Sequence, residues 1–413
     1  MTKIRLFILK SVTVFLIGIL NPALGQSITL SDNLTATISQ NTDRVFVHLN
    51  KNVFVTGEYM YFKAYVVNNH TLKISKSKIL YFDLIDFNNN AVKSWRCNVN
   101  NGIASSKILI PAIPESGVFT LFAYTNRMLN FPRGLFFSTN IFVTKANDPS
   151  VDKVFYPGSN DTIEKGRYYP YPSSIPAKEG IEILNLKESY RKREKIQFEI
   201  VVSGLQDNEI ADLSATVKEK QPFEFLEVNN EISFYLPDKA DFVKAFIQNL
   251  PEPDQYNWLN PANINILNFP FLPEEKGFIL SGKLTEKEQG LPVQNETVLI
   301  SCKDTISTLK YCKTDKNGRF QFLLGKFYDN KEIILHTYNS SGTKNQYKWH
   351  LDLNKPVYEN GNMVAFHLSE EDREYLNYCR KLWSWVKLAE NVYICKKHNY
   401  ETLPCCYLSA LRQ

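Results

Sequence analysis

The chain has 413 residues, of which 44% are hydrophobic and 13% aromatic, and this content excludes a protein that is disordered throughout. Its 48 basic and 43 acidic residues leave a net charge of +5 that is spread along the chain. A nucleic-acid-binding protein would gather its basic residues on one face, so that class is not indicated. The 27 Phe and 22 Tyr residues favour strands over helices, and the length predicts about two to four domains.

The N-terminus has the pattern of a signal peptide. Basic residues precede an apolar run at 11–20, and the small residues Ala23 and Gly25 suit cleavage before Gln26. A membrane anchor is the alternative, but the run is shorter than the roughly 20 helical residues that a bilayer requires. No later segment is long and apolar enough to span a membrane. We therefore expect export, with the mature protein outside the cytoplasm.

Residues 43–146 predict one β-sandwich. Apolar and polar residues alternate with a period of two, which is typical of half-buried strands, and no helical period competes. The expected strands are separated by Asn-, Gly- and Pro-containing turns and lie at 44–49, 59–67, 79–86, 91–99, 105–110, 118–125 and 138–144. Short strands at such regular intervals indicate an immunoglobulin-like sandwich.

Residues 147–181 contain many Pro and Gly residues and predict an extended linker. Within it, Tyr168, Tyr169 and Tyr171 lie beside prolines. These aromatic residues either dock on a partner or pack on the neighbouring domain. Residues 182–275 then predict a second β domain that is only partly legible, with one strand near 196–202, another near 213–217 and a short helix at 241–250.

Residues 276–352 predict a third β-sandwich. Its expected strands lie at 278–283, 298–302, 309–313, 319–323 and 332–338, with a turn at 315–318. The tail, 366–413, contains cysteines and begins with a helix. Ser369 is followed by three acidic residues, which is the pattern of a helix N-cap, and the helix is expected to end near Ala389.

The seven cysteines do not form a dense disulfide framework, and an odd number leaves at least one unpaired. Cys302 and Cys312 lie on strands expected to be neighbours, so we predict a candidate disulfide between them. Four cysteines lie in the last 35 residues. Three of them, Cys395, Cys405 and Cys406, could bind a metal ion together with His398, but their spacing matches no structural zinc pattern, so free or disulfide-bonded cysteines are favoured.

No motif in the chain indicates catalysis. The sequence has no zinc-protease helix, no nucleophile elbow and no phosphate-binding Gly-rich loop. Asp83 and Asp86 with the asparagines after them could coordinate calcium, although a solvated strand end explains them equally well. His48 alternates with apolar neighbours, which favours a structural role. We therefore predict no catalytic, cofactor-binding or metal-binding residue and no enzyme activity.

The first domain resembles the macroglobulin MG2-type domain of the α2-macroglobulin-like exported proteins of Bacteroidetes. The residues that carry the resemblance are Val45–Lys51, Gly57–Tyr65, Tyr81–Asp86 and Ser116–Asn126, about a quarter of the chain. The resemblance implies a fold and no chemistry, and with the expected export it implies a location in the periplasm or at the outer membrane of a Gram-negative bacterium. The Cys-Gly-Glu-Gln run of the thioester in protease-trapping macroglobulins is absent, so covalent protease capture is not expected.

The third domain is similar to the carboxypeptidase regulatory-like sandwich. The resemblance rests on Ser281–Leu284, Gly290–Val293, Val298–Ile300 and Thr314–Phe322. In such families this domain is a non-catalytic module beside another domain, which in Bacteroidetes envelope proteins is often a TonB-dependent receptor. No such receptor follows here.

These features predict an all-β protein of tandem immunoglobulin-like, macroglobulin-type sandwiches with a short C-terminal helix. The expected function is a non-enzymatic binding or scaffold protein of the bacterial envelope, whose partner is another envelope protein or a polymer. Two alternatives stay open: an accessory or truncated relative of a TonB-dependent transport system, and a thioester-less macroglobulin relative that interacts with proteases. The ligand and the oligomeric state are not encoded in any recognisable motif.

Overall fold

The computed structural model describes residues 42–148, 153–157, 181–203, 271–302, 308–325, 333–337, 347–352 and 363–397, with short gaps inside these ranges and a few isolated residues besides. The predicted all-β class is confirmed: the described residues form six sheets and one long C-terminal helix. The expected signal peptide, the tyrosines of the expected linker and the expected helix at 241–250 lie outside the described residues.

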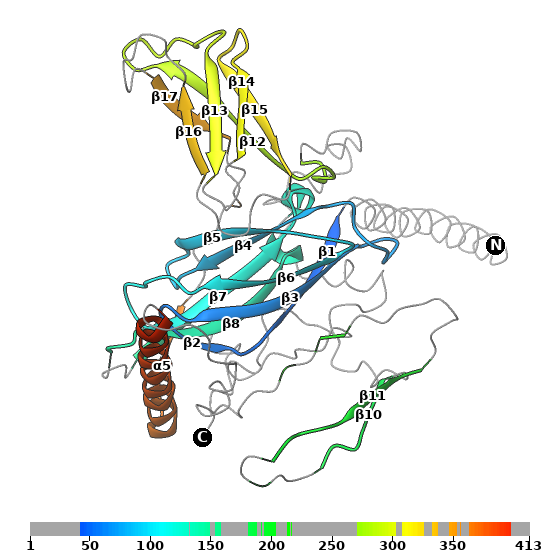
Figure 1. The fold of residues 1–413 in the computed structure, drawn as a ribbon, viewed down its shortest axis with the longest axis vertical. Helices are drawn as coiled ribbons and strands as arrows, with labels where there is room; N and C mark the ends of the chain where they lie inside the picture. The colour runs from blue at the N-terminus through cyan, green and yellow to red at the C-terminus, as the bar shows by residue number, and fades with distance from the viewer. Residues whose placement is uncertain are drawn as a thin grey trace, which may run out of the picture.

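The first sandwich packs a three-stranded sheet against a five-stranded sheet (Figure 1). The smaller sheet has the order β1 (Asp43–Leu49), β3 (Tyr59–Asn68), β6 (Ile103–Leu109). The larger sheet has the order β2 (Val53–Val55), β8 (Phe137–Thr144), β7 (Gly117–Tyr124), β4 (Ile79–Ile85), β5 (Ala91–Asn98). The sequence missed β2, because three residues are too few to establish a period.

Alternation in the sequence sets the two faces of β3. Met60 and Ala64 are fully buried in the core, whereas Tyr61 is 52% exposed on the opposite face. Gly57 turns the chain into this strand with a positive φ of 83°, a conformation that glycine adopts without steric cost. Across the core, the rings of Phe62 and Phe82 lie with their centroids 4.7 Å apart, which joins the two sheets.

The third sandwich consists of two three-stranded sheets. One has the order β15 (Arg319–Leu324), β12 (Phe278–Glu286), β17 (Tyr347–Leu351), and the other β14 (Thr308–Lys313), β13 (Thr297–Cys302), β16 (Ile333–Thr337). Its core is formed by Phe278, Leu280, Val298, Ile300, Phe320, Phe322 and Leu324. Figure 1 shows these strands as a separate body beyond the β4–β5 side of the first sandwich.

Two pairs of strands differ from the expected layout. The segment predicted as an extended linker contains β9 (Lys153–Pro157), which pairs antiparallel with β18 (Met363–His367). It ends with β10 (Ile181–Leu184), which pairs with β11 (Glu199–Val202). The stretch 147–181, expected as a linker, therefore contains β9 and the first residue of β10. Prolines and glycines surround β9, and its partner β18 lies about 200 residues away, so this pairing leaves no local signal.

The C-terminal helix α5 (Glu370–Lys397) begins at the predicted cap and runs past the expected end near Ala389. Ser369 Oγ accepts a hydrogen bond from the Asp372 N–H at 3.1 Å, and Asp372 Oδ2 accepts from the Ser369 N–H at 2.8 Å. This reciprocal arrangement satisfies two backbone donors that a helix end otherwise leaves unpaired.

The inner face of α5 lies against the β2 edge of the first sandwich (Figure 1). Leu376 is buried, and Arg380 directs its guanidinium to Thr144 Oγ1 with Nε and Nη2 at 3.0 and 2.7 Å. Burial lowers the pKa of Arg380 from its usual range, and the Asp148 carboxylate opposes that shift. The helix is therefore anchored to the end of β8 by a buried charge-assisted contact.

We expect Ser369→Ala to weaken the first turn of α5 by about 1 kcal/mol, because Ala cannot accept the Asp372 N–H. Hydrogen exchange of the amides at 370–373 should then accelerate about fivefold. Ser384→Ala is the matched control, since Ser384 lies mid-helix and its hydroxyl donates to the Lys381 carbonyl. Equal exchange in the two variants would contradict the capping role.

Candidate functional site

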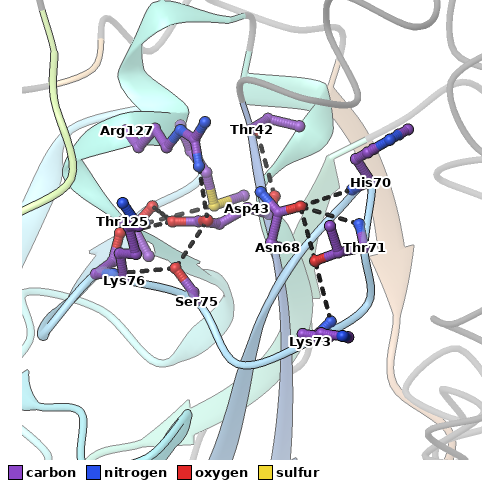
Figure 2. Close-up of polar contacts among 12 residues, drawn as sticks. Thr42, Asp43, Asn68, His70, Thr71, Lys73, Ser75, Lys76, Thr125 and Arg127 are labelled. Carbon is purple, nitrogen blue, oxygen red and sulfur yellow. Dashed lines mark hydrogen bonds and ion pairs between the residues drawn. The ribbon is translucent and has the colours of Figure 1, made fainter.

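A buried carboxylate at one end of the first sandwich joins three separate segments. Asp43, at the start of β1, has a side chain with no exposed surface. It accepts hydrogen bonds from the hydroxyls of Ser75 at 2.8 Å, Ser77 at 2.6 Å and Thr125 at 2.8 Å. Arg127 Nη1 lies 3.7 Å from the same carboxylate, and Figure 2 shows Arg127, Thr125 and Ser75 converging on it.

Each of these donors lies next to residues that contact the third sandwich. Thr125 precedes the short 3-10 helix η1 (Asn126–Asn130), and its N–H is held by Met128 Sδ at 3.4 Å. Ser75 and Ser77 lie in the loop that leads into β4. The Asp43 cluster, defined as Asp43 with its three hydroxyl donors and Arg127, therefore fixes the two segments that meet the start of the third domain.

The chain that enters the third sandwich, residues 271–275, is clamped on this surface. Asn130 forms a reciprocal pair with Phe271: its Oδ1 accepts the Phe271 N–H at 3.0 Å and its Nδ2 donates to the Phe271 carbonyl at 2.6 Å. Asn126 Nδ2 donates to the Leu272 carbonyl at 2.9 Å, and the Lys78 N–H donates to the Glu274 carbonyl at 3.0 Å. Both segments held by the Asp43 cluster thus bind the connecting chain.

Apolar and aromatic contacts extend this junction. Ile79 of β4 is fully buried in the core of the third sandwich, together with Phe278 and Leu280. Tyr81 packs against both cores and stacks on Tyr124 with ring centroids 5.5 Å apart. The Arg96 guanidinium lies over the Phe278 ring, 4.3 Å from its centroid. The junction, defined as residues 271–279 with these contacts, is therefore packed as well as hydrogen-bonded.

Glu274 is the buried acid of the junction. Only 8% of it is exposed, and the Tyr81 hydroxyl lies 3.0 and 2.9 Å from its two carboxylate oxygens. Burial raises the pKa of Glu274 from its usual 4.5 to about 7, although the hydrogen bonds from Tyr81 and the Ile279 N–H and the charge of Arg96 lower it. Burial also raises the pKa of Tyr81, and the Glu274 carboxylate raises it further. Sequence reasoning missed Glu274, because Tyr81 lies 193 residues away.

The two carboxylates considered for calcium binding accept hydrogen bonds from other groups of the protein. Asp83 is buried, and its Oδ2 accepts the Tyr124 hydroxyl at 2.8 Å. Asp86 Oδ1 accepts the Asn88 and Asn90 N–H groups, each at 2.8 Å, in an exposed turn. The solvated strand-end explanation therefore fits Asp86, whereas Asp83 is buried within β4 and bonded to Tyr124. His48 likewise has a structural contact, with Nδ1 2.6 Å from Ser214 Oγ.

The predicted disulfide between Cys302 and Cys312 does not form. Their strands β13 and β14 are neighbours, as expected, but the register pairs Cys302 with Thr308 and Cys312 with Val298. The thiol of Cys312 is free, and burial raises its pKa. The two cysteines lie four positions apart along the antiparallel pair, beyond the Cα separation that a disulfide bridges.

Two outward sheet faces carry large apolar side chains. On the first sandwich these are Tyr59, Tyr61 and Leu109, at 38%, 52% and 48% exposure, and Lys107 Nζ lies 4.2 Å from the Tyr59 ring centroid. On the third sandwich the β14–β13–β16 sheet exposes Leu309, Tyr311 and Ile334.

Within the part of the chain that the structure describes, no three His, Cys, Asp or Glu side chains group as metal ligands, and no helix is both long and apolar enough to cross a bilayer.

The likenesses to solved structures described below are distant. No protein-family model matches the chain, and no curated protein matches it. Among solved structures, a Salmonella α2-macroglobulin reacted with methylamine aligns at 9% identity and a TM-score of 0.21, over 79% of this chain and 15% of that one. The E. coli α2-macroglobulin in its native conformation aligns at 10% identity and a TM-score of 0.22, over 75% and 14%.

A β-glucosidase from Listeria innocua aligns at 11% identity and a TM-score of 0.17, over 25% of this chain and 16% of that one. The chain thus spans about 15% of the length of the Salmonella protein. Scores of this size fall on proteins of different kinds, so the fold class rests on the observed strands and their register.

Proposed function

We propose that this chain is an exported, non-enzymatic binding or scaffold protein of the bacterial cell envelope, built from macroglobulin-like β-sandwiches. The expected signal peptide at 1–25 supports export, and the MG2-type resemblance at Val45–Lys51 and Gly57–Tyr65 supports the domain type. The described polar clusters are engaged in hydrogen bonds that join segments of the fold, which agrees with a structural use of buried charge.

The observation that carries the proposal is the outward face of the β14–β13–β16 sheet. Tyr311 and Leu309 are 74% and 65% exposed, and Ile334 is 38% exposed. The register places Leu299 beside Tyr311, and Ser301 between Leu309 and Ile334, so the apolar side chains lie across all three strands. Large apolar side chains exposed together on one sheet face favour a site of protein–protein contact. The partner we propose for it is another envelope protein.

The test is capture of a specific partner from envelope extract by the purified mature chain. The double variant Leu309→Ser, Tyr311→Ser should reduce capture at least about tenfold, because a few large apolar side chains provide most of the affinity of an interface. Leu323→Ser is the matched control, since Leu323 is 43% exposed on the opposite sheet. Capture of no specific partner, or equal capture by both variants, would rule the proposal out.

A further inference from the structure

The junction places an ionisable group at the point where the two described sandwiches meet. Glu274 lies between Tyr81 of β4 and the start of β12, and little of its carboxyl group reaches solvent. We propose that Glu274 is a proton-controlled latch: its protonated form holds the third sandwich docked on the first, and its ionisation loosens that contact.

The groups that face Glu274 leave its negative charge poorly compensated. From β4 comes the neutral hydroxyl of Tyr81, and from β12 the Ile279 N–H. From β5 comes Arg96, whose charge lowers the pKa of Glu274, but its guanidinium is stacked on the Phe278 ring and forms no ion pair within 4.0 Å among the described residues. A buried carboxylate without a direct cationic partner favours its protonated form.

The other charged side chains near the junction form their contacts with groups other than Glu274. Lys76, in the loop before β4, pairs with the neighbouring Glu275 at 3.4 Å, and both side chains are more than half exposed. Arg127 of η1 faces Asp43, and the other η1 contacts come from the neutral amides of Asn126 and Asn130. The charge state of the buried part of the junction therefore depends on Glu274.

The raised pKa of Glu274 sets the direction in which pH changes the docking of the third sandwich. The pKa of Glu274 is about 7 when docked, above the usual 4.5 of an exposed glutamate. A raised pKa contributes stability that is fully present below about 4.5 and is lost as the pH rises through about 7. A shift of this size corresponds to a loss of about two orders of magnitude in the ratio of docked to undocked molecules.

The contact is limited enough for such a change to matter. Apart from the clamp on 271–275, the described contacts across it are chiefly those of Ile79, Tyr81 and Arg96 with the third core. Contacts of this extent between domains permit relative motion unless they are reinforced. The proton on Glu274 is the reinforcement that we assign here.

Hydrogen exchange of the full mature chain between pH 5 and pH 8 tests the latch, with intrinsic exchange rates divided out. The reporting amides are Lys78, Phe271 and Ile279, whose N–H groups donate within the junction. In the wild-type chain their protection should fall by up to about a hundredfold as the pH rises through 7. In Glu274→Gln, which stays neutral, protection should no longer depend on pH.

Two further variants make the outcome decisive. Glu275→Gln changes the adjacent exposed glutamate and should keep the wild-type pH profile. Tyr81→Phe removes a hydrogen bond that lowers the pKa of Glu274, so the transition should move to higher pH, and this direction decides the matter if Glu274→Gln fails to dock. A wild-type profile that is flat, rises with pH or is unchanged in Glu274→Gln and Tyr81→Phe would overturn the proposal.

Discussion

Asp43→Ala is expected to lower the free energy of unfolding of the first sandwich by about 3 to 5 kcal/mol. The substitution leaves the hydroxyls of Ser75, Ser77 and Thr125 without their acceptor, and Arg127 without its carboxylate, at a site closed to water. Each buried donor that loses its partner costs about 1 to 3 kcal/mol. Because the same segments clamp 271–275, protection of the Phe271 amide should fall with the stability. Urea unfolding at fixed pH measures the first effect and hydrogen exchange the second.

Asp86→Ala is the control for that prediction. Asp86 also accepts three hydrogen bonds, from the Asn88 N–H, the Asn90 N–H and the Asn90 side-chain amide, but its turn is exposed. Water replaces the lost acceptor there, so the expected cost is about 1 kcal/mol. Similar losses of unfolding free energy in the two variants would show that burial does not determine how much the Asp43 cluster stabilises the fold.

The strands that the sequence predicted are those with a local signal. Along β3, Met60, Phe62, Ala64 and Val66 face the core and alternate with outward residues, so the amino-acid order itself displays a period of two. Ser369 with the acids after it located the start of α5 for the same reason, since a cap and its partner lie three residues apart. Its end was misplaced because no comparable stop signal follows Ala389.

The parts that the sequence could not predict depend on partners far along the chain. β9 pairs with β18 across about 200 residues, and neither strand alternates strictly between apolar and polar residues. The Asp43 cluster needs Thr125, and Glu274 needs Tyr81, and no spacing rule connects either pair. The prediction of a disulfide between Cys302 and Cys312 was wrong although their strands are neighbours. The positions of the two cysteines in the sequence do not determine the register in which the strands pair.

Gly282→Ala should destabilise the third sandwich by about 3 kcal/mol. Gly282 lies in β12, the central strand of its sheet, where a Cβ atom would come within 2.5 Å of the His350 carbonyl oxygen of β17. It would also lie 2.8 Å from Cζ of the buried Phe320 ring, which packs edge-on against Trp349. The chain can accommodate the methyl group only by separating β12 from β17 or by displacing Phe320 from the core.

Calorimetry of the full chain measures the effect as a fall of at least about 10 °C in the melting transition of the third sandwich. Gly325→Ala is the matched control: nothing lies within 4 Å of its Cβ position, so its cost should stay within about 0.5 kcal/mol. Since Phe278 and Ile79 join the third core to the first, the junction amides should lose protection in Gly282→Ala at every pH, unlike the pH-dependent loss assigned to Glu274. A third sandwich unaffected by the added methyl group would show that β12 and β17 are not in close contact at Gly282.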